Sequence, residues 1–235
     1  RRNKLSDFVQ VNRNGKIAMK LEDEGDEILG VETCTENDDV LLVANSGQCI
    51  RFPVSDVRVF AGRNSIGVRG IALGEGEQVI SITILHHGET DAGKRGAYLK
   101  RAAAERRAAG LDEEEVTLTN EEATDNGELS EDDYARMKRE EQFVLTVTEF
   151  GYGKRSSSYD FRVTGRGGKG IRATDISKRD EIGRLVAAFP VEDGDQIMLV
   201  SNGGQVIRVP VDGIRLASRA TKGVTIFNTA EGEKV

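Results

Sequence analysis

A stretch rich in glycine and cations, Thr164 to Arg172, is the first place where the sequence suggests chemistry. It reads Thr-Gly-Arg-Gly-Gly-Lys-Gly-Ile-Arg, with four glycines and three cations in nine residues. Gly165, Gly167 and Gly170 have the spacing of the dinucleotide-binding fingerprint, in which backbone amides hold a pyrophosphate. That fingerprint needs an apolar strand in front and a helix behind, but three serines and a short strand at 161–163 precede this loop. A Walker loop would need Ser or Thr where Gly170 stands. Neither nucleotide motif is therefore expected here.

Internal repetition gives the loop a different context. A first landmark, glycine followed four residues later by arginine, occurs at Gly47–Arg51, Gly151–Arg155 and Gly204–Arg208. A second landmark, glycine preceded four residues earlier by arginine, occurs at Arg63–Gly67, Arg166–Gly170 and Arg219–Gly223. Gly170 and Gly223 are 53 residues apart, a weaker copy at Gly15 lies 52 residues before Gly67, and 103 residues separate Gly67 from Gly170. The chain is thus a repeat of about 52 residues that carries one insertion of about 50.

The content of each repeat predicts β-structure. Apolar runs at 40–44, 143–147 and 196–200 each lead into a glycine-containing turn and a second strand, which is typical of a hairpin. Further apolar strands are expected at 28–31, 79–82 and 185–188, and one more at each second landmark, so that a unit has four strands. The predicted fold is all-β: a propeller-like array, or β-pinwheel, of four-stranded antiparallel blades. Residues 176–189 also fit helical spacing behind an Asp175 or Ser177 cap, but the repeat favours a turn and a strand.

Residues 86–142 form the insertion, and their composition differs from the rest of the chain. Residues 92–109 are rich in alanine and end at Gly110, which predicts a helix. Ser130 is placed to cap a second helix with an acidic first turn, and the acidic link between the two helices is expected to be mobile. We expect residues 1–85 and 143–235 to form one domain around this insertion. The insertion is either a solvated helical excursion or an acidic arm that docks on basic partners or competes with an anionic ligand.

The distribution of charge decides which partners are possible. The whole chain has a formal net charge of −7, and residues 86–142 hold 16 acidic and 9 basic residues, which also gives −7. The remainder holds 24 of each sign. A neutral body is compatible with an anionic partner if its cations are clustered, so their placement matters more than their number.

Recurrent cations beside recurrent glycines favour phosphate binding. Glycine permits tight turns with exposed amides, and sites repeated at a fixed interval suit a polymer of phosphates. The primary phosphate ligands are predicted to be Arg63, Arg69, Arg166, Lys169, Arg172, Arg219 and Lys222, with Arg13 and Lys16 as a fourth, weaker set. Secondary ligands are predicted at the hairpin ends: Arg51, Lys154, Arg155 and Arg208.

Other chemistries are not supported by the residues present. Cys34 and Cys49 have no partner at a metal-binding spacing, so both are expected to be small buried apolar residues. His86 and His87 are adjacent and lack a chelating third ligand, so no metal site is expected. No apolar run approaches the length of a membrane span, and no secretory segment follows the N-terminus, so a soluble chain is expected. Because the chain does not begin with Met, we expect it to be an excised fragment.

Five segments together resemble the C-terminal domain of the bacterial DNA gyrase A subunit, which is a β-pinwheel of propeller-like blades. They are Gly-Lys-Ile-Ala-Met-Lys-Leu (15–21), Gly-Val-Arg-Gly-Ile-Ala-Leu-Gly-Glu-Gly-Glu (67–77), Gly-Tyr-Gly-Lys-Arg (151–155), Asp-Gly-Asp-Gln-Ile-Met-Leu-Val (193–200) and Arg-Ala-Thr-Lys-Gly-Val (219–224). The resemblance covers the chain except the insertion. The signature box of the family is Gln-basic-basic-Gly-Gly-basic-Gly. The box-like loop Thr164, Gly165, Arg166, Gly167, Gly168, Lys169 and Gly170 matches its last five positions.

The resemblance implies a non-catalytic domain that wraps duplex DNA around a basic blade edge and so gives negative supercoiling its direction. It implies double-stranded DNA as a partner. It further implies an A2B2 heterotetramer with the rest of the gyrase A polypeptide and with the gyrase B polypeptide, in a bacterial, cytoplasmic, chromosome-associated enzyme. No cofactor is expected in this chain, since ATP and Mg²⁺ are used elsewhere in that ATP-dependent type II topoisomerase. None of the tyrosines (Tyr98, Tyr134, Tyr152 and Tyr159) follows an arginine, so none is expected to be the cleavage nucleophile.

Several alternatives stay open on the sequence alone. The equivalent domain of topoisomerase IV also fits, and a protein-binding propeller fits less well because it would not need cations in register. In the family the box that governs wrapping lies in the first blade, so the loop at 164–170 either dominates DNA binding or assists a box elsewhere. The chain is expected to start inside one blade and to end at the opening of another.

Overall fold

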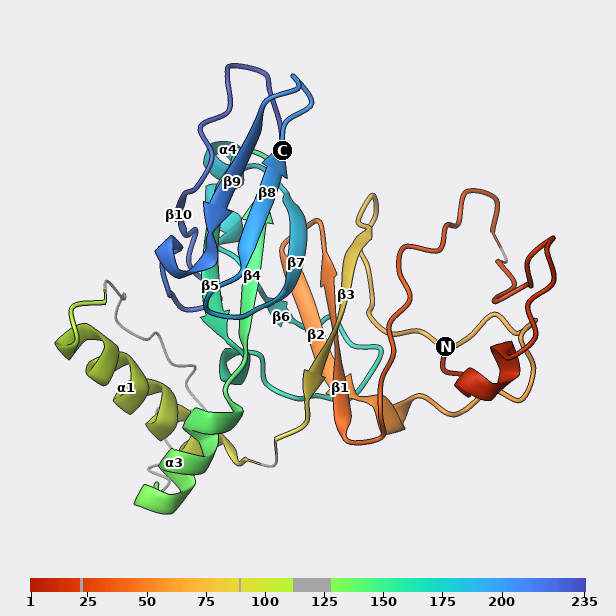
Figure 1. Cartoon of the computed structure of the whole chain (residues 1–235), viewed down its shortest axis with the longest axis horizontal. Coiled ribbons are helices and arrows are strands. Elements are labelled where there is room, and N and C mark those ends of the chain that lie inside the picture. Colours follow the sequence, from red (N-terminus) through yellow and green to blue (C-terminus); the bar gives the residue numbers. More distant parts are fainter. Residues whose placement is uncertain (22, 89, 112–127) are drawn as a thin grey trace.

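The computed structural model describes residues 1–21, 23–88, 90–111 and 128–235 (Figure 1). Two four-stranded sheets and one further hairpin stand side by side. The first sheet has the order β3-β1-β2-β6 and the second the order β10-β5-β4-β7. The strands of the first sheet are β1 (Asp38–Ala44), β2 (Gln48–Pro53), β3 (Val79–His86) and β6 (Ile171–Arg172). Those of the second are β4 (Phe143–Thr148), β5 (Tyr152–Ser157), β7 (Leu185–Val191) and β10 (Val224–Thr225), and the hairpin is β8 (Gln196–Val200) with β9 (Val206–Pro210).

Each sheet is completed by a strand from the following repeat. β6 comes after the β4–β5 hairpin in the chain, yet it pairs with β2, where Ile171 lies opposite Cys49. In the same way β10 follows β9 but pairs with β5, where Val224 lies opposite Gly153. The sheets are therefore linked by exchanged strands, and the strand order puts each exchanged strand at the edge opposite β3 or β7.

The hydrophobic cores lie between the layers. Leu41 and Val43 of β1 pack with Val144 of β4 and Leu185 of β7, so one core joins the two sheets. Leu145 and Val147, which point to the other face of β4, pack against the β8–β9 hairpin. Strand residues alternate between faces, and here both faces of β1 and of β4 pack against apolar residues, which explains their nearly continuous apolar sequences.

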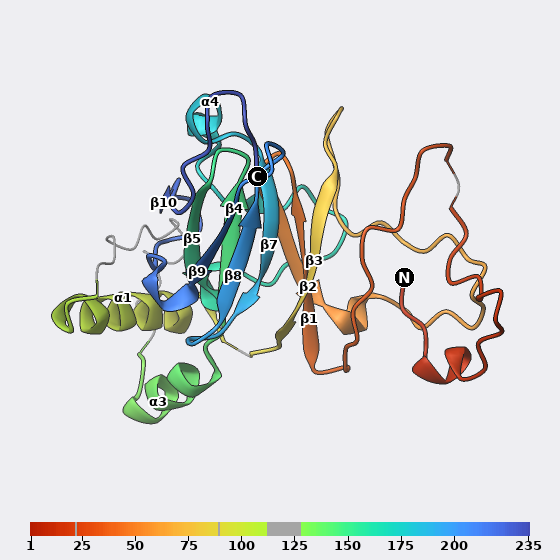
Figure 2. The same ribbon diagram turned by 45° about the horizontal axis from the view of Figure 1, so that its top comes forward.

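A pair of helices projects from the sheets on the side away from the N-terminal segment (Figures 1 and 2). Helix α1 (Ala92–Ala108) begins at Asp91, whose side chain accepts a hydrogen bond from the amide of Lys94. Helix α3 (Glu131–Glu140) begins at Ser130, which accepts from the amide of Asp133, so the predicted serine cap is confirmed. The acidic link predicted between the helices lies outside the described residues.

Three tyrosines fasten the helix pair to the second sheet. The ring centroids of Tyr98 (α1) and Tyr134 (α3) are 5.4 Å apart, and Tyr98 lies 5.0 Å from Tyr159, edge to face. The Tyr159 hydroxyl donates to the carbonyl of Met137 at 3.1 Å. At the base of the insertion, the amide of His86 donates to Oε1 of Gln142 at 2.7 Å, so its two ends are held together.

The remaining regular elements are short. The 3₁₀ turns are Leu5–Phe8, Val54–Asp56, Ser158–Asp160, Ile176–Lys178 and Val211–Gly213, and α4 (Arg179–Ile182) is a single turn. Residues 176–189, which fit both a helix and a strand by sequence, contain short helical turns followed by a strand. A 3₁₀ turn capped by Asp175 and the turn of α4 end at Gly183, and strand β7 follows. None of the described helices is long and apolar enough to cross a membrane.

The prediction of an all-β, propeller-like array with a helical insertion is confirmed. Two of the predicted strand positions are wrong, because residues 28–31 and 67–68 are loops. Their equivalents in later repeats, β7 and β6, pair with a neighbouring hairpin. On the N-terminal side the described residues contain no hairpin to supply that ladder, and a strand without a partner leaves its backbone groups unpaired.

Candidate nucleic-acid interface

Four equivalent seven-residue segments carry the recurrent cations. We call residues 11–17, 63–69, 166–172 and 219–225 the crossing segments, because the last two pass from their own hairpin to the preceding sheet. The fifth residue of each is the landmark glycine: Gly15, Gly67, Gly170 and Gly223. The last two residues of the third and fourth segments are β6 and β10, so these segments form the outer edge of their sheets.

Backbone hydrogen bonds join the third and fourth crossing segments to the residues that directly follow the preceding segment. The amide of Gly167 donates to the carbonyl of Gly70 at 2.7 Å, and the amide of Ala72 donates back to Gly168 at 2.9 Å. At the next junction the amide of Asp175 donates to the carbonyl of Thr221 at 3.3 Å. The second, third and fourth segments, together with the residues that directly follow them, thus form one continuous edge rather than isolated loops.

Two of the landmark glycines are required by close backbone contacts. Gly170 has φ of 74°, and a Cβ atom there would lie 2.0 Å from the carbonyl oxygen of Cys49. Gly223 has φ of 80°, and its Cβ would lie 2.5 Å from the carbonyl oxygen of Gly153. Only glycine combines positive φ with so close an approach to the neighbouring hairpin, which gives these glycines a structural function in the strand exchange.

Four of the predicted ligands expose their side chains along this edge: Arg13, Arg69, Lys169 and Arg172. Lys16 and Lys222 are half-buried. Lys222 Nζ lies 2.5 Å from Oε1 of Glu181 and 5.4 Å from the ring centroid of Tyr152. Its hydrogen bond lowers the pKa of Glu181, so this cation is shared with a carboxylate of the same chain. The structure therefore brings cations from four repeats onto one edge.

The first residue of three crossing segments is an arginine that points back to the preceding repeat. Nη1 donates to the carbonyl of the last residue of the preceding crossing segment: Arg63 to Ile17 at 2.8 Å, Arg166 to Arg69 at 2.5 Å, and Arg219 to Arg172 at 2.5 Å. All three side chains are half-buried. They were predicted as primary phosphate ligands, and the structure instead gives each an internal partner that sequence spacing did not reveal.

Three predicted secondary ligands are buried, which contradicts their assignment to a DNA-facing surface. Lys154 is 1% exposed, Arg51 5% and Arg155 7%. Arg51 Nε lies 2.8 Å from Oδ2 of the fully buried Asp39, and its Nη1 donates to the carbonyl of Ser158 at 2.7 Å. Arg155 Nε donates to the carbonyl of Ile214 at 2.8 Å, and Lys154 Nζ donates to the carbonyls of Ala173 and Thr221. These side chains bind the next repeat and cannot reach a duplex.

Arg208 occupies the equivalent position on β9, but it is exposed. Of the four secondary ligands predicted from sequence, it alone remains accessible.

The two cysteines differ in exposure, and each histidine lies beside an aspartate. Cys49 is buried, and burial raises the pKa of its thiol to about 12, as expected for a small apolar residue. Cys34 is exposed, so the prediction of burial is wrong for it. His86 Nδ1 lies 3.2 Å from Asp38 and His87 Nδ1 lies 2.7 Å from Asp39. Among the described residues, no group of three His, Cys, Asp or Glu side chains could hold a metal ion.

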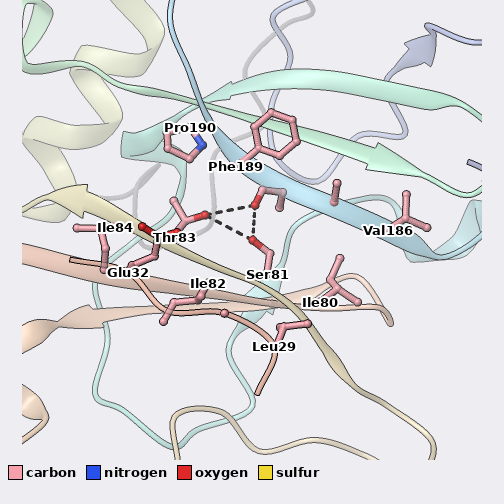
Figure 3. Close-up of a pocket in the computed structure, with 13 residues that line it drawn as sticks. Leu29, Glu32, Ile80, Ser81, Ile82, Thr83, Ile84, Val186, Phe189 and Pro190 are labelled. Carbon is pink, nitrogen blue, oxygen red and sulfur yellow. Dashed lines mark hydrogen bonds between the residues drawn. The ribbon is translucent and has the colours of Figure 1, made fainter. Parts of the chain in front are cut away.

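A cavity of about 350 Å³ lies on the opposite side of the sheets, between β3 and β7 (Figure 3). Its walls come from equivalent positions of three repeats: residues 29–32, 80–84 and 186–190. The hydroxyls of Ser81 and Thr83 both point to the carbonyl of Ala188 (Figure 3). Both hydroxyls therefore already donate to a carbonyl of the cavity wall. For this reason we interpret the cavity as a gap between neighbouring strands rather than as a ligand site with convergent polar groups.

Together these features define a class of protein: a propeller-like array of blades that are linked by exchanged strands and carry cations along one outer edge. Comparison with known families gives the same class. The family model described as the DNA gyrase C-terminal domain, beta-propeller, matches residues 1–35, 38–86, 142–192 and 195–235, and the chain belongs to this family. Residues 87–141, which contain the two helices, fall between matched parts.

Curated relatives match over the whole chain. The DNA gyrase A subunit of Granulibacter bethesdensis is 48% identical over 245 residues, covering 100% of this chain and 26% of the relative. The DNA gyrase A subunit of Rickettsia bellii is 41% identical, covering 100% of this chain and 25% of the relative. The chain thus spans about a quarter of the length of these relatives.

Solved structures with the same fold are more distant in sequence. A structure of the DNA gyrase A C-terminal domain gives a TM-score of 0.65 at 20% identity, over 97% of this chain and 57% of the other. The C-terminal domain of DNA topoisomerase IV gives 0.63 at 16% identity, over 92% of this chain and 50% of the other. At these identities the likeness concerns the fold alone.

Proposed function

We propose that the chain is the DNA-wrapping part of a gyrase A polypeptide and that it binds the phosphates of duplex DNA along the outer edge made by the crossing segments. The observation that carries this proposal is the hydrogen-bonded succession of those segments. Because of these hydrogen bonds, cations that are 52 to 103 residues apart in the sequence lie on neighbouring segments of one edge. The family and the names of the relatives support DNA as the partner.

The physics of DNA bending explains why a repeated edge suits this task. Bending 20 to 30 base pairs by 40 to 90° costs on the order of 1 to 6 kcal/mol, so contacts have to be spread along the bend. Lysine and arginine contacts to phosphate carry no sequence information directly and release counterions. A row of blades with one cationic segment each provides contacts of that kind.

The proposed contacts are four exposed and two half-buried cations of the crossing segments. They are Arg13, Lys16, Arg69, Lys169, Arg172 and Lys222, with the box-like loop Thr164–Gly170 supplying Lys169. Arg208 is retained as a secondary contact at the β9 end. Arg51, Lys154 and Arg155 are omitted because they are buried.

The rest of the enzyme is proposed from the family. The chain itself contributes binding rather than catalysis, and the cleavage tyrosine and the ATP- and Mg²⁺-dependent steps belong to parts outside it. Its partners would be the rest of the gyrase A polypeptide and the gyrase B polypeptide in an A2B2 assembly in the bacterial cytoplasm. Residues 1–85 and 143–235 are proposed to act as one domain, with residues 86–142 as an accessory insertion.

A topological assay tests wrapping directly. A nicked circular DNA is saturated with the chain at low salt and sealed with ligase, and the linking number is measured after the protein is removed. A wrap that writhes the duplex shifts the distribution of linking numbers in proportion to bound protein. An unshifted distribution, with binding verified by gel retardation, would remove wrapping from the proposal.

The topoisomerase IV alternative shares the fold, as the second solved structure indicates. The two curated relatives are both gyrase proteins, which favours the gyrase assignment. A protein-binding propeller would not account for cations that recur at one position of each repeat.

A further inference from the structure

One hydrogen bond recurs at all three junctions between the crossing segments. In each case Nη1 of the arginine at the first position donates to the carbonyl of the seventh residue of the preceding segment. The three donors are 103 and 53 residues apart, and the three acceptors are 52 and 103 residues apart, so both sets follow the repeat and its one insertion. A contact repeated in this way belongs to the architecture of the array rather than to one loop.

The same guanidinium makes a second contact at two of the junctions. Arg166 Nε donates to the carbonyl of Asp56 at 3.3 Å, and Arg219 Nε donates to the carbonyl of Asp160 at 2.8 Å. Asp56 and Asp160 end the 3₁₀ turns that follow β2 and β5. One side chain therefore ties three pieces together: its own segment, the preceding crossing segment and the end of the preceding hairpin.

The acceptor residues connect this contact to DNA binding. The carbonyls that receive Nη1 of Arg166 and Arg219 belong to Arg69 and Arg172, whose own side chains are exposed. Each contact thus fixes the backbone from which a proposed phosphate ligand extends. A guanidinium has its donors in a rigid planar fork, which suits two fixed acceptors in different directions, whereas the three donors of an ammonium all lie on one freely rotating nitrogen atom.

We propose that Arg166 and Arg219 are positioning residues, which set the spacing and angle between successive crossing segments and thereby the path that the DNA follows. This inference rests on the proposed wrapping function. It differs from the sequence-based prediction, in which the same arginines are phosphate ligands, because a ligand acts on affinity whereas a positioning residue acts on the geometry of the bound DNA.

The decisive variant is Arg166→Lys in the 235-residue chain, because it keeps the positive charge and removes the fork. The matched variant is Lys169→Ala, which removes an exposed charge from the same loop. Two quantities are measured for each: the slope of log K against log salt, and the linking-number shift per bound chain at saturation. Thermal unfolding identifies variants that are folded, and Arg219→Lys repeats the test at the next junction if Arg166→Lys does not fold.

We expect Arg166→Lys to keep the wild-type salt slope and to lose about half or more of the linking-number shift, because charge is kept while the fixed geometry is lost. Lys169→Ala is expected to lower the salt slope by about 0.9 and to keep the shift per bound chain. A wild-type shift in Arg166→Lys and Arg219→Lys would overturn the positioning function. If the wild-type chain itself gives no shift, the wrapping proposal fails, and this outcome is distinct from the first.

Discussion

The landmark glycines and the cations beside them differ in what they do, although the sequence presents them as one motif. Gly170 is held against the backbone of Cys49, and Arg166 is held against two carbonyls of the preceding repeat. Lys169, between them, is exposed. One loop of seven residues therefore contains both residues that hold the repeats together and a proposed phosphate ligand. Single substitutions can test these two functions separately.

Two glycines of the same loop give opposite predictions. Gly170→Ala introduces positive φ at a non-glycine residue and a Cβ 2.0 Å from the oxygen of Cys49. We expect it to lower the free energy of unfolding by at least about 2 kcal/mol. Gly165→Ala meets nothing within 4 Å and is expected to change stability by less than about 0.5 kcal/mol. Urea denaturation of both variants measures the difference, and equal stabilities would show that the close contact is not present in solution.

Arg51 gives a second prediction at this scale, because its ion pair with Asp39 is buried. Burial lowers the pKa of Arg51 and the nearby Asp39 opposes this change, but the guanidinium remains charged. Arg51→Ala leaves a buried carboxylate without this partner, and we expect a loss of about 3 to 5 kcal/mol in the free energy of unfolding. The salt slope of DNA binding, measured where the variant is folded, should be unchanged. A reduced slope would return Arg51 to the set of phosphate ligands.

At the scale of elements, the insertion replaces a tight turn. β7 is joined to β8 by Glu192-Asp193-Gly194-Asp195, whereas the equivalent connection from β3 to β4 contains α1 and α3. Its net charge is not evenly distributed. Residues 90–111 and 128–142 contain 9 basic and 8 acidic residues, so the acidic excess lies outside the described ranges. Several of these charges are paired between the two helices, as in Arg101–Glu131 and Lys138–Glu105.

Deleting residues 88–139 tests both interpretations of the insertion. The deletion removes 14 acidic and 9 basic residues, a net charge of −5, and its ends are already held by the His86–Gln142 hydrogen bond. We expect the strands to form as before, as measured by circular dichroism. We expect DNA to bind more tightly, because repulsion is removed. Weaker binding would instead make α1 a DNA contact, with the exposed Lys100 as the first residue to test.

The sequence predicted the strands much better than their partners. The hairpins at 40–51, 143–155 and 196–208 follow from apolar runs that end at a glycine turn, and α1 and α3 follow from helix formers and a cap. Periodicity cannot tell which sheet a strand joins, so the exchange of β6 and β10 was not foreseen. Nor could the spacing separate Arg51 and Arg155 from exposed arginines. The only signal was local: Ser156-Ser157-Ser158 after Arg155 are the small residues that close packing requires.

For the whole molecule, the salt dependence of binding reports how many contacts act together. The six cations proposed as contacts predict a slope of log K against log salt of about −5. Affinity should then fall by about a thousandfold between 50 and 200 mM salt, despite the net charge of −7. Fluorescence anisotropy with a short duplex measures the slope. A value near −2 would mean that only one or two repeats touch DNA at once.

Strand exchange has a consequence for how the protein folds during its synthesis on the ribosome. The first sheet is completed when Ile171 pairs with Cys49, 122 positions earlier in the chain. At a synthesis rate of about 5 to 20 residues per second, the β1–β2 hairpin waits roughly 6 to 24 s for its last strand. During that time its outer edge is open to pairing with another nascent chain. The insertion lengthens this interval, because its residues are synthesised after the β1–β2 hairpin and before β6.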